Sequence, residues 1–270
     1  MLLMVGGLSI VVQPSDSAAV KFIWAQKRLA ELEDLLRAFN KDNPNPASLD
    51  PDASDGAKQV YRCNSVPLLP PEVPLMVGEI LYGFRSALDC AVYAISARKD
   101  PDFRSGFPIF LHPAPNWQGA GNERGFDPDG LRKIRLLPCE AQEIIKRYQP
   151  YDNHPTPASA PVWWLQELRN IDEHRTILLA SAVVKTKTLS ARSEVDEHVP
   201  APLTWTNWGF KEGDVVVSIT LRSKTKFEPH FATEVLLREP GEFVNRELPF
   251  LLRSIRDKVR GAIDDLQSFI

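Results

Sequence analysis

The chain has 270 residues, of which 43% are hydrophobic and 25% are charged, values close to those of average globular proteins that exclude wholesale disorder. Its formal net charge of −3 excludes a general attraction to nucleic acid or to anionic membranes, so any phosphate-binding surface must be a local patch. The three cysteines, Cys63, Cys90 and Cys139, lie too far apart for a disulfide framework or a C-x-x-C metal site. This pattern fits a reducing compartment, and we expect a cytoplasmic protein.

The N-terminal segment Met1 to Val12 is apolar, but it lacks the basic residues that open a secretory signal and is too short to span a bilayer. We therefore expect an unpaired first strand, or a start codon placed too far upstream, rather than export. No membrane partner is predicted.

Two long helices are predicted in the first part of the chain, at about Ser17–Asn40 and Pro74–Ala97. In each, apolar residues recur at intervals of three and four, which is typical of a helix with one buried face. The apolar residues are Phe22, Ala25, Leu29, Leu32, Leu36 and Phe39 in the first helix and Val77, Ile80, Phe84, Leu88, Ala91 and Ile95 in the second. Between the helices, residues 40–56 are predicted to form an exposed loop and Gln59–Val66 a short strand.

The segment from Lys99 to Gly130 has no periodic pattern and contains the run Phe107-Pro108-Ile109-Phe110. It is longer than ordinary connections, so we expect it either to be functional or to wrap the core. A short third helix is predicted at about Cys139–Tyr148, and a fourth at about Ala160–Ala182.

After the fourth helix the pattern changes from helical to strand-like. The predicted strands are an edge strand at Val183–Leu189, a hairpin of Leu203–Phe210 and Val215–Arg222 that turns at Lys211–Asp214, and a third strand at Phe231–Arg238. The last helix, about Asn245–Ile270, keeps an apolar spacing of three and four throughout, so it must pack along another long helix.

These elements predict an α+β fold: a bundle of four to five mostly long helices, with a small antiparallel sheet inserted before the C-terminal helix. We expect a single domain over residues 1–270, with the bundle at about 17–182 and 245–270 and the β segment at about 183–240.

The fourth predicted helix carries the densest set of polar side chains. On an ideal helix Trp164, Leu168, Ile171 and Leu178 share one apolar stripe with Arg175. A guanidinium on a buried face must be paired or reach a cavity. Asp172 and His174 flank the stripe, and Asn170 lies one turn before His174. These residues form either a structural hydrogen-bonded network or a functional site.

The second predicted helix offers partners for this set. Arg85 and Asp89 are four residues apart and can pair on one face, although the order with the cation first is the weaker one. Such a pair is either an ordinary ion pair at the helix surface or part of a larger network. In the larger network, Asp89 would neutralise Arg175 across the bundle, which requires the two helices to be neighbours.

Three motifs occur in the order Arg85-Ser86-Ala87-Leu88-Asp89, Phe107-Pro108-Ile109 and Asn170-Ile171-Asp172-Glu173-His174-Arg175. They resemble a set of uncharacterised bacterial proteins in which a helix that reads L-R-S-A-L-D precedes one that reads N-x-D-K-H-R. The resemblance covers about Leu75 to Thr176 and implies a bacterial protein, with no known activity attached. Glu173 stands where that pattern has a lysine.

Residues 169–174 also have the form R-N-x3-H, which resembles the motif of HEPN domains. These are helical bundles that often act as metal-independent ribonucleases and often form dimers. The resemblance implies that Arg169 and His174 are a catalytic pair, that RNA is a partner, and that the chain forms a homodimer. An imidazole can move the proton of a ribose 2′-hydroxyl, and an arginine can stabilise charge on the phosphate. On an ideal helix, however, the two side chains point about 140° apart, so they converge only at a bent end or a dimer interface.

Other chemistry has little support in the sequence. His112, His154, His198 and His230 are scattered without the spacing of a metal site, and glycine-rich phosphate or dinucleotide motifs are absent. No metal or other cofactor is predicted, and the sequence identifies no small-molecule ligand. Trp205 and Trp208 alternate with polar residues on the predicted hairpin, where they either pack against the bundle or form a partner surface.

Two functions therefore stay open. The first is a non-catalytic binding or assembly module whose polar helix network is structural, which we favour because a phosphate-binding surface is not evident. The second is a HEPN-like ribonuclease. A solvent-exposed His174 close to Arg169 favours the enzyme, whereas burial in a satisfied network favours the module.

Overall fold

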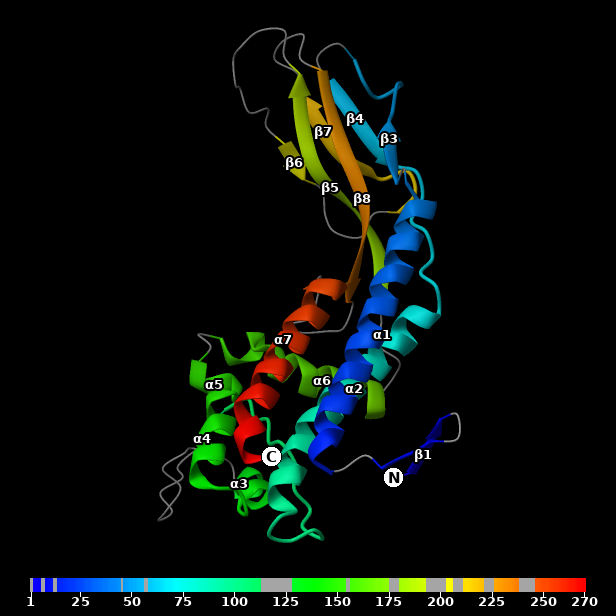
Figure 1. The fold of residues 1–270 in the computed structure, drawn as a ribbon. Helices are drawn as coiled ribbons and strands as arrows, with labels where there is room; N and C mark the ends of the chain where they lie inside the picture. Colours follow the sequence, from blue (N-terminus) through cyan, green and yellow to red (C-terminus); the bar gives the residue numbers. More distant parts are fainter. Residues whose placement is uncertain are drawn as a thin grey trace.

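The protein has an α+β fold in which the helices gather at one end of the molecule and most strands at the other, as Figure 1 shows. This computed structural model describes residues 2–5, 8–11, 14–44, 46–55, 58–112, 128–153, 156–174, 180–192, 203–205, 211–220, 226–237 and 246–270. The longest helix, α1 (Pro14–Asp42), runs from the helical end to the strands (Figure 1).

The helical end is built on α1 and α2 (Glu72–Ser96), which pack against each other. Every residue of the two predicted apolar stripes is buried, which confirms both helices. The two helices approach closely where Gly83 meets Ala25: a Cβ placed at Gly83 would lie 2.7 Å from the Cβ of Ala25. The chain therefore has two small residues at this close approach of the backbones.

The remaining helices complete the core around α2. They are α3 (Pro128–Ile134), α4 (Cys139–Arg147), α5 (Pro150–Asn153), the 3₁₀ turn η1 (Pro157–Ser159), α6 (Pro161–His174), α7 (Leu248–Leu266) and the 3₁₀ turn η3 (Gln267–Phe269). Both α6 and α7 pack against α2 and against each other. The apolar residues of α7 from Leu248 to Leu266 line its buried face, so the predicted C-terminal helix is confirmed.

All strand pairs in the described part of the chain are antiparallel. One sheet has the order β3 (Ala47–Leu49), β4 (Lys58–Cys63), β7 (Val215–Thr220) and β6 (Leu203–Trp205), and a second has the order β5 (Ala180–Arg192), β8 (Lys226–Leu237) and β9 (Arg246–Glu247). A separate hairpin joins β1 (Leu2–Val5) and β2 (Leu8–Val11). The rings of Tyr61 on β4 and Phe231 on β8 lie 5.5 Å apart, which brings the two larger sheets into contact.

A sheet does precede the C-terminal helix, as predicted, but two predictions about it were incomplete. Strands β3 and β4 come from before α2, so the first larger sheet joins segments far apart in the sequence. Within the predicted exposed loop 40–56, residues Ala47–Leu49 form a strand that pairs with β4. This pairing satisfies backbone hydrogen-bonding groups that an exposed loop would leave to water. The N-terminal strand, expected to be unpaired, forms the β1–β2 hairpin.

The predicted fourth helix was too long. Helix α6 ends at His174, and residues 180–182, which were assigned to that helix, begin β5. The physical reason is the long pairing of β5 with β8, from Ala180 opposite Leu237 to Arg192 opposite Lys226. Tertiary pairing of this kind overrides the helix propensity of alanine. Strand β5 lies at the edge of its sheet, as expected for Val183–Leu189.

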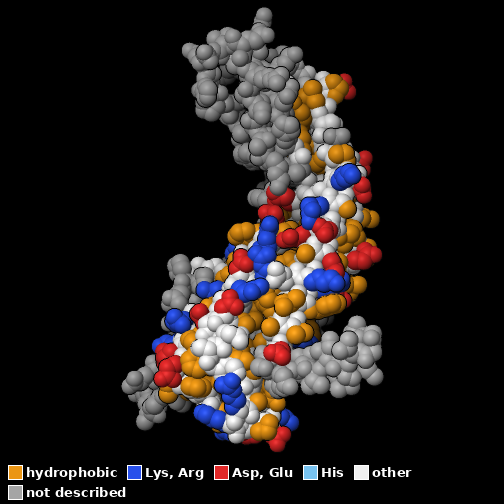
Figure 2. Space-filling model, in the orientation of Figure 1, with side chains coloured by type: hydrophobic (Ala, Val, Ile, Leu, Met, Phe, Trp, Pro, Cys, Tyr) orange, Lys and Arg blue, Asp and Glu red, His pale blue; other side chains and the backbone are white. Residues whose placement is uncertain are grey.

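The surface carries charges of both signs. Figure 2 shows one face of the molecule, where basic and acidic side chains are interspersed along the helices with hydrophobic ones between them. This distribution agrees with the formal net charge of −3. Among the helices of the described residues, none combines the length and the apolar character needed to cross a membrane.

Candidate functional site

Arg85 and Asp89 form the predicted ion pair on α2, and the pair holds the backbone of Phe107. Arg85 Nη2 and Nε donate to Asp89 Oδ1 and Oδ2 at 2.9 and 3.2 Å. The same Nη2 donates to the carbonyl oxygen of Phe107 at 2.6 Å, and the amide of Phe107 donates to Asp89 Oδ1 at 2.9 Å. Arg85 is 8% exposed and the Asp89 side chain is 40% exposed, so the pair is a partly buried backbone clamp rather than a fully exposed ion pair.

The segment that follows is fixed by Gln149. Its side-chain Nε2 donates to the carbonyl oxygen of Pro108 at 2.7 Å, and its Oε1 accepts from the amide of Phe110 at 3.1 Å. Phe107 and Ile109 are buried in the main core. This part of the long predicted loop therefore wraps the core. The sequence analysis did not single out Gln149. A polar residue just before Pro150 is common at the end of a helix, so the sequence gives no sign of its contacts with Pro108 and Phe110.

The predicted catalytic pair on α6 is linked through Glu173. Arg169 Nη1 lies 2.8 Å from Glu173 Oε2, and His174 Nε2 lies 3.8 Å from the same oxygen. The side chain of His174 is 67% exposed, whereas that of Arg169 is 25% exposed. Both side chains thus approach the same carboxylate oxygen.

Asn170 and Asp172 make separate contacts. Asn170 Oδ1 accepts from Gln166 at 3.2 Å, so this amide interacts within its own helix. Asp172 packs against α2 at Gly78, where an added Cβ would lie 2.5 Å from its Oδ2. Burial, with a smaller contribution from the neighbouring Glu173, raises the pKa of Asp172 above its ordinary value.

Arg175 lies outside the described residues, and so does its predicted pairing with Asp89. What the structure describes for Asp89 is its contact with Arg85 and with the amide of Phe107. Trp208 also lies outside the described residues, and Trp205 ends β6.

Tyr82 on α2 is a residue that the sequence analysis missed. Its ring is 54% exposed and lies between two cations: Lys21 Nζ of α1 is 5.7 Å from the ring centroid, and Arg169 Cζ of α6 is 5.8 Å from it. Both distances fall within the range of cation–π attraction. A local basic and aromatic cluster therefore forms from three helices that are far apart in the sequence.

The two guanidinium groups near Tyr82 are incompletely paired. Among the described contacts, Arg85 Nη1 and Arg169 Nε are buried and have no hydrogen-bond partner. Burial lowers the pKa of Arg85, the charge of Asp89 opposes this, and repulsion from Arg169 adds to it. Arg169 lies over the ring of Tyr82, and Arg85 follows Tyr82 by one turn of α2, so the two arginines lie in the same region of the molecule.

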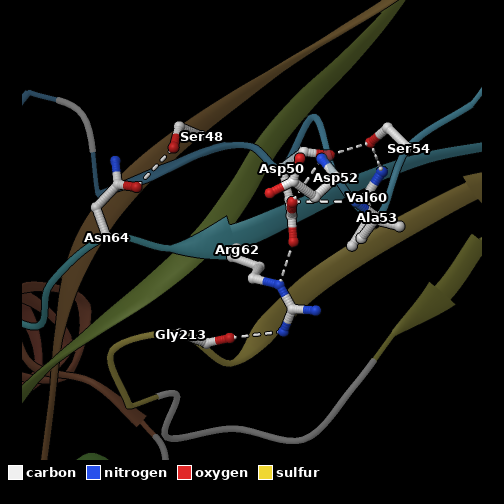
Figure 3. A network of polar contacts seen from close by, with 9 residues as sticks. All are labelled: Ser48, Asp50, Asp52, Ala53, Ser54, Val60, Arg62, Asn64 and Gly213. Atoms are coloured by element: carbon white, nitrogen blue, oxygen red, sulfur yellow. Dashed lines mark hydrogen bonds and ion pairs between the residues drawn. The ribbon is translucent and has the colours of Figure 1, made fainter.

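A second polar cluster, at the strand end of the molecule, is structural (Figure 3). Asp50 accepts from the amides of Asp52 and Ala53 and pairs with Arg62 Nε at 2.5 Å. Arg62 Nη1 also donates to the carbonyl oxygen of Gly213 at 2.8 Å. The hydrogen bond from Arg62, followed by those from the backbone, lowers the pKa of Asp50. These contacts join the β3–β4 hairpin to the turn before β7.

Neither a metal centre nor a known relative guides the assignment. In the described part of the chain, His, Cys, Asp and Glu nowhere form a group of three that could hold a metal ion. Comparison of the chain with protein-family models, with curated proteins and with solved structures found no match.

Proposed function

We propose that the protein is a non-catalytic binding or assembly module in which the polar residues of α2 and α6 mainly fix the fold. The observation that carries this proposal is the position of Glu173, whose Oε2 lies 2.8 Å from Arg169 and 3.8 Å from His174. Cleavage by this pair would require a phosphate between the two side chains. A carboxylate in that place repels a phosphate and already pairs with the arginine.

The residues on α2 support the same proposal. Arg85 and Asp89 make their hydrogen bonds to each other and to the backbone of Phe107, and Arg85 is buried. A charged pair whose arginine is buried and whose other partners are backbone atoms fixes one segment against another. The clamp therefore has a structural role that needs no substrate.

The second candidate function is a HEPN-like, metal-independent ribonuclease. The observation in its favour is that the His174 side chain is 67% exposed, so its imidazole can reach a ribose 2′-hydroxyl. Glu173 is 45% exposed and would have to rotate away before Nη1 of Arg169 could hold a phosphate beside His174. The resemblance behind this candidate also implies a homodimer, in which a second copy would bring another histidine to the site.

Cleavage of mixed single-stranded RNAs by the purified chain in EDTA separates the two functions. The module predicts no cleavage by the wild type. His174→Ala tests the nuclease, and His112→Ala is the matched control because His112 is also exposed but lies outside α6. Metal-independent products with 2′,3′-cyclic phosphate ends that disappear in His174→Ala and persist in His112→Ala would refute the module and establish the nuclease.

A further inference from the structure

The buried donors of Arg85 and Arg169 lack acceptors among the described residues. Arg85 is 8% exposed, yet its Nη1 has no hydrogen-bond partner, and Arg169 Nε is in the same condition. A buried charged donor without an acceptor is unfavourable, because the group has lost water and gained nothing in exchange. Two such donors that belong to neighbouring cations make an anion the natural missing partner.

The nearby carboxylates do not supply that partner. Asp89 pairs with Nε and Nη2 of Arg85, and Glu173 pairs with Nη1 of Arg169. The unpaired atoms are the remaining Nη1 of Arg85 and Nε of Arg169. Each arginine is thus neutralised on one edge and left with an unpaired N–H group elsewhere.

Tyr82 marks where an anion would enter. It lies one helical turn before Arg85 on α2, and its exposed ring has Arg169 Cζ at 5.8 Å and Lys21 Nζ at 5.7 Å. Two cations, from α1 and α6, therefore lie near one exposed residue of α2, and the buried Arg85 follows that residue by one turn. Nη1 of Arg85 and Nε of Arg169 are buried, so a ligand would reach them only after the side chain of Arg169 moves away from the Tyr82 ring.

We propose that Lys21, Arg85 and Arg169 bind the phosphoryl group of a small phosphorylated ligand beside Tyr82. This inference rests on the proposed binding function and names the class of ligand. A phosphoryl group has several acceptor oxygens and up to two negative charges, which match guanidinium donors and a lysine better than a single carboxylate does. The exposed ring of Tyr82 can stack on a planar group such as a base.

The test is calorimetric titration of the full chain with inorganic phosphate at constant ionic strength. Arg169→Met should weaken phosphate binding at least tenfold. Lys27→Met is the matched control, because Lys27 likewise lies over an exposed ring, Trp24 at 5.3 Å, and near a carboxylate four residues on, Glu31 at 3.9 Å. It should leave the affinity within twofold of the wild type. Absence of phosphate binding, or equal losses in both variants, would overturn the inference.

Adenosine monophosphate, as a second titrant, distinguishes a nucleotide from free phosphate. Binding tighter than that of phosphate, with the advantage lost in Tyr82→Leu, supports a nucleotide, whereas equal binding supports phosphate itself. The RNA assay is independent of this result. If the protein neither binds phosphate nor cleaves RNA, these results overturn the inference and leave the proposed function standing. RNA cleavage that depends on His174 overturns the proposed function.

Discussion

Removal of the Asp89 carboxylate is the sharpest test of the backbone clamp. Asp89→Ala deletes the acceptor of three hydrogen bonds, two from Arg85 and one from the amide of Phe107. It leaves Arg85, 8% exposed, with the carbonyl oxygen of Phe107 as its described acceptor. Breaking a buried ion pair by removing one partner costs about 3–5 kcal/mol. The Asp89 side chain is 40% exposed, so water can partly replace it, and we expect about 3 kcal/mol, the lower end of that range.

Urea unfolding followed by helical circular dichroism measures this loss. Asp34→Ala is the matched control, because Asp34 also pairs with an arginine on its own helix but is 65% exposed. Exposed pairs contribute about 0–1 kcal/mol, so the control should change the free energy of unfolding by less than about 1 kcal/mol. Equal losses in the two variants would refute the clamp, because Arg85 would then not depend on Asp89.

Three further predictions concern packing and titration. Gly83→Ala should lower the free energy of unfolding by about 1–3 kcal/mol, despite the better helix propensity of alanine, because the new Cβ would lie 2.7 Å from that of Ala25. In the same urea experiment, adding Ala25→Gly should recover part of the loss. If the effects of the two substitutions were strictly additive, the contact would be contradicted. Because the pKa of Asp172 is raised in the folded state, the stability of the wild type falls as pH rises through that pKa. Asp172→Asn should therefore be more stable than the wild type at pH 7, and the difference should shrink in acid. Thermal melts across pH measure this difference, and they would show the opposite trend if Asp172 had a cationic partner. Burial and the hydrogen bond to Asp265 raise the pKa of Tyr148 to about 12, so the stability of the fold should decrease between pH 10 and 12. Absorbance at the tyrosinate band should show a late titration step that is missing in Tyr148→Phe. A wild type without this late step would contradict the contact with Asp265.

The helices that the sequence predicted best are those with a continuous apolar stripe. In α1, α2 and α7 the spacing of three and four extends over most of the helix, and the predicted residues are buried. The end of α6 was misplaced because Ala180–Ala182 fits either a helix or a strand. Strand β5, which begins at Ala180, pairs with β8, and β8 lies more than 40 residues later in the sequence. Local propensity contains no information about such a distant partner.

The candidate site was predictable only where its contacts are local. The Arg85–Asp89 pair follows from a spacing of four on one helix, and the structure confirms it. The acceptor and donor that complete the clamp are backbone atoms of Phe107, which every residue possesses, so no side-chain pattern could identify them. Tyr82 was missed because its two cations come from helices whose packing against α2 is a tertiary property.

The criterion that separated the two functions in the sequence was a solvent-exposed His174 close to Arg169, and the exposure of His174, at 67%, agrees with the nuclease. Exposure is necessary for proton transfer but does not supply a binding site for the phosphate. In the described geometry the cation that would bind it is Arg169, whose Nη1 is paired with Glu173 and whose Nε is unpaired. The phosphoryl group that we propose would satisfy Nε, whereas cleavage with His174 would require Nη1 to leave Glu173. The proposed binding function therefore uses the donor of Arg169 that is unpaired, and the alternative nuclease would need the donor that is already paired.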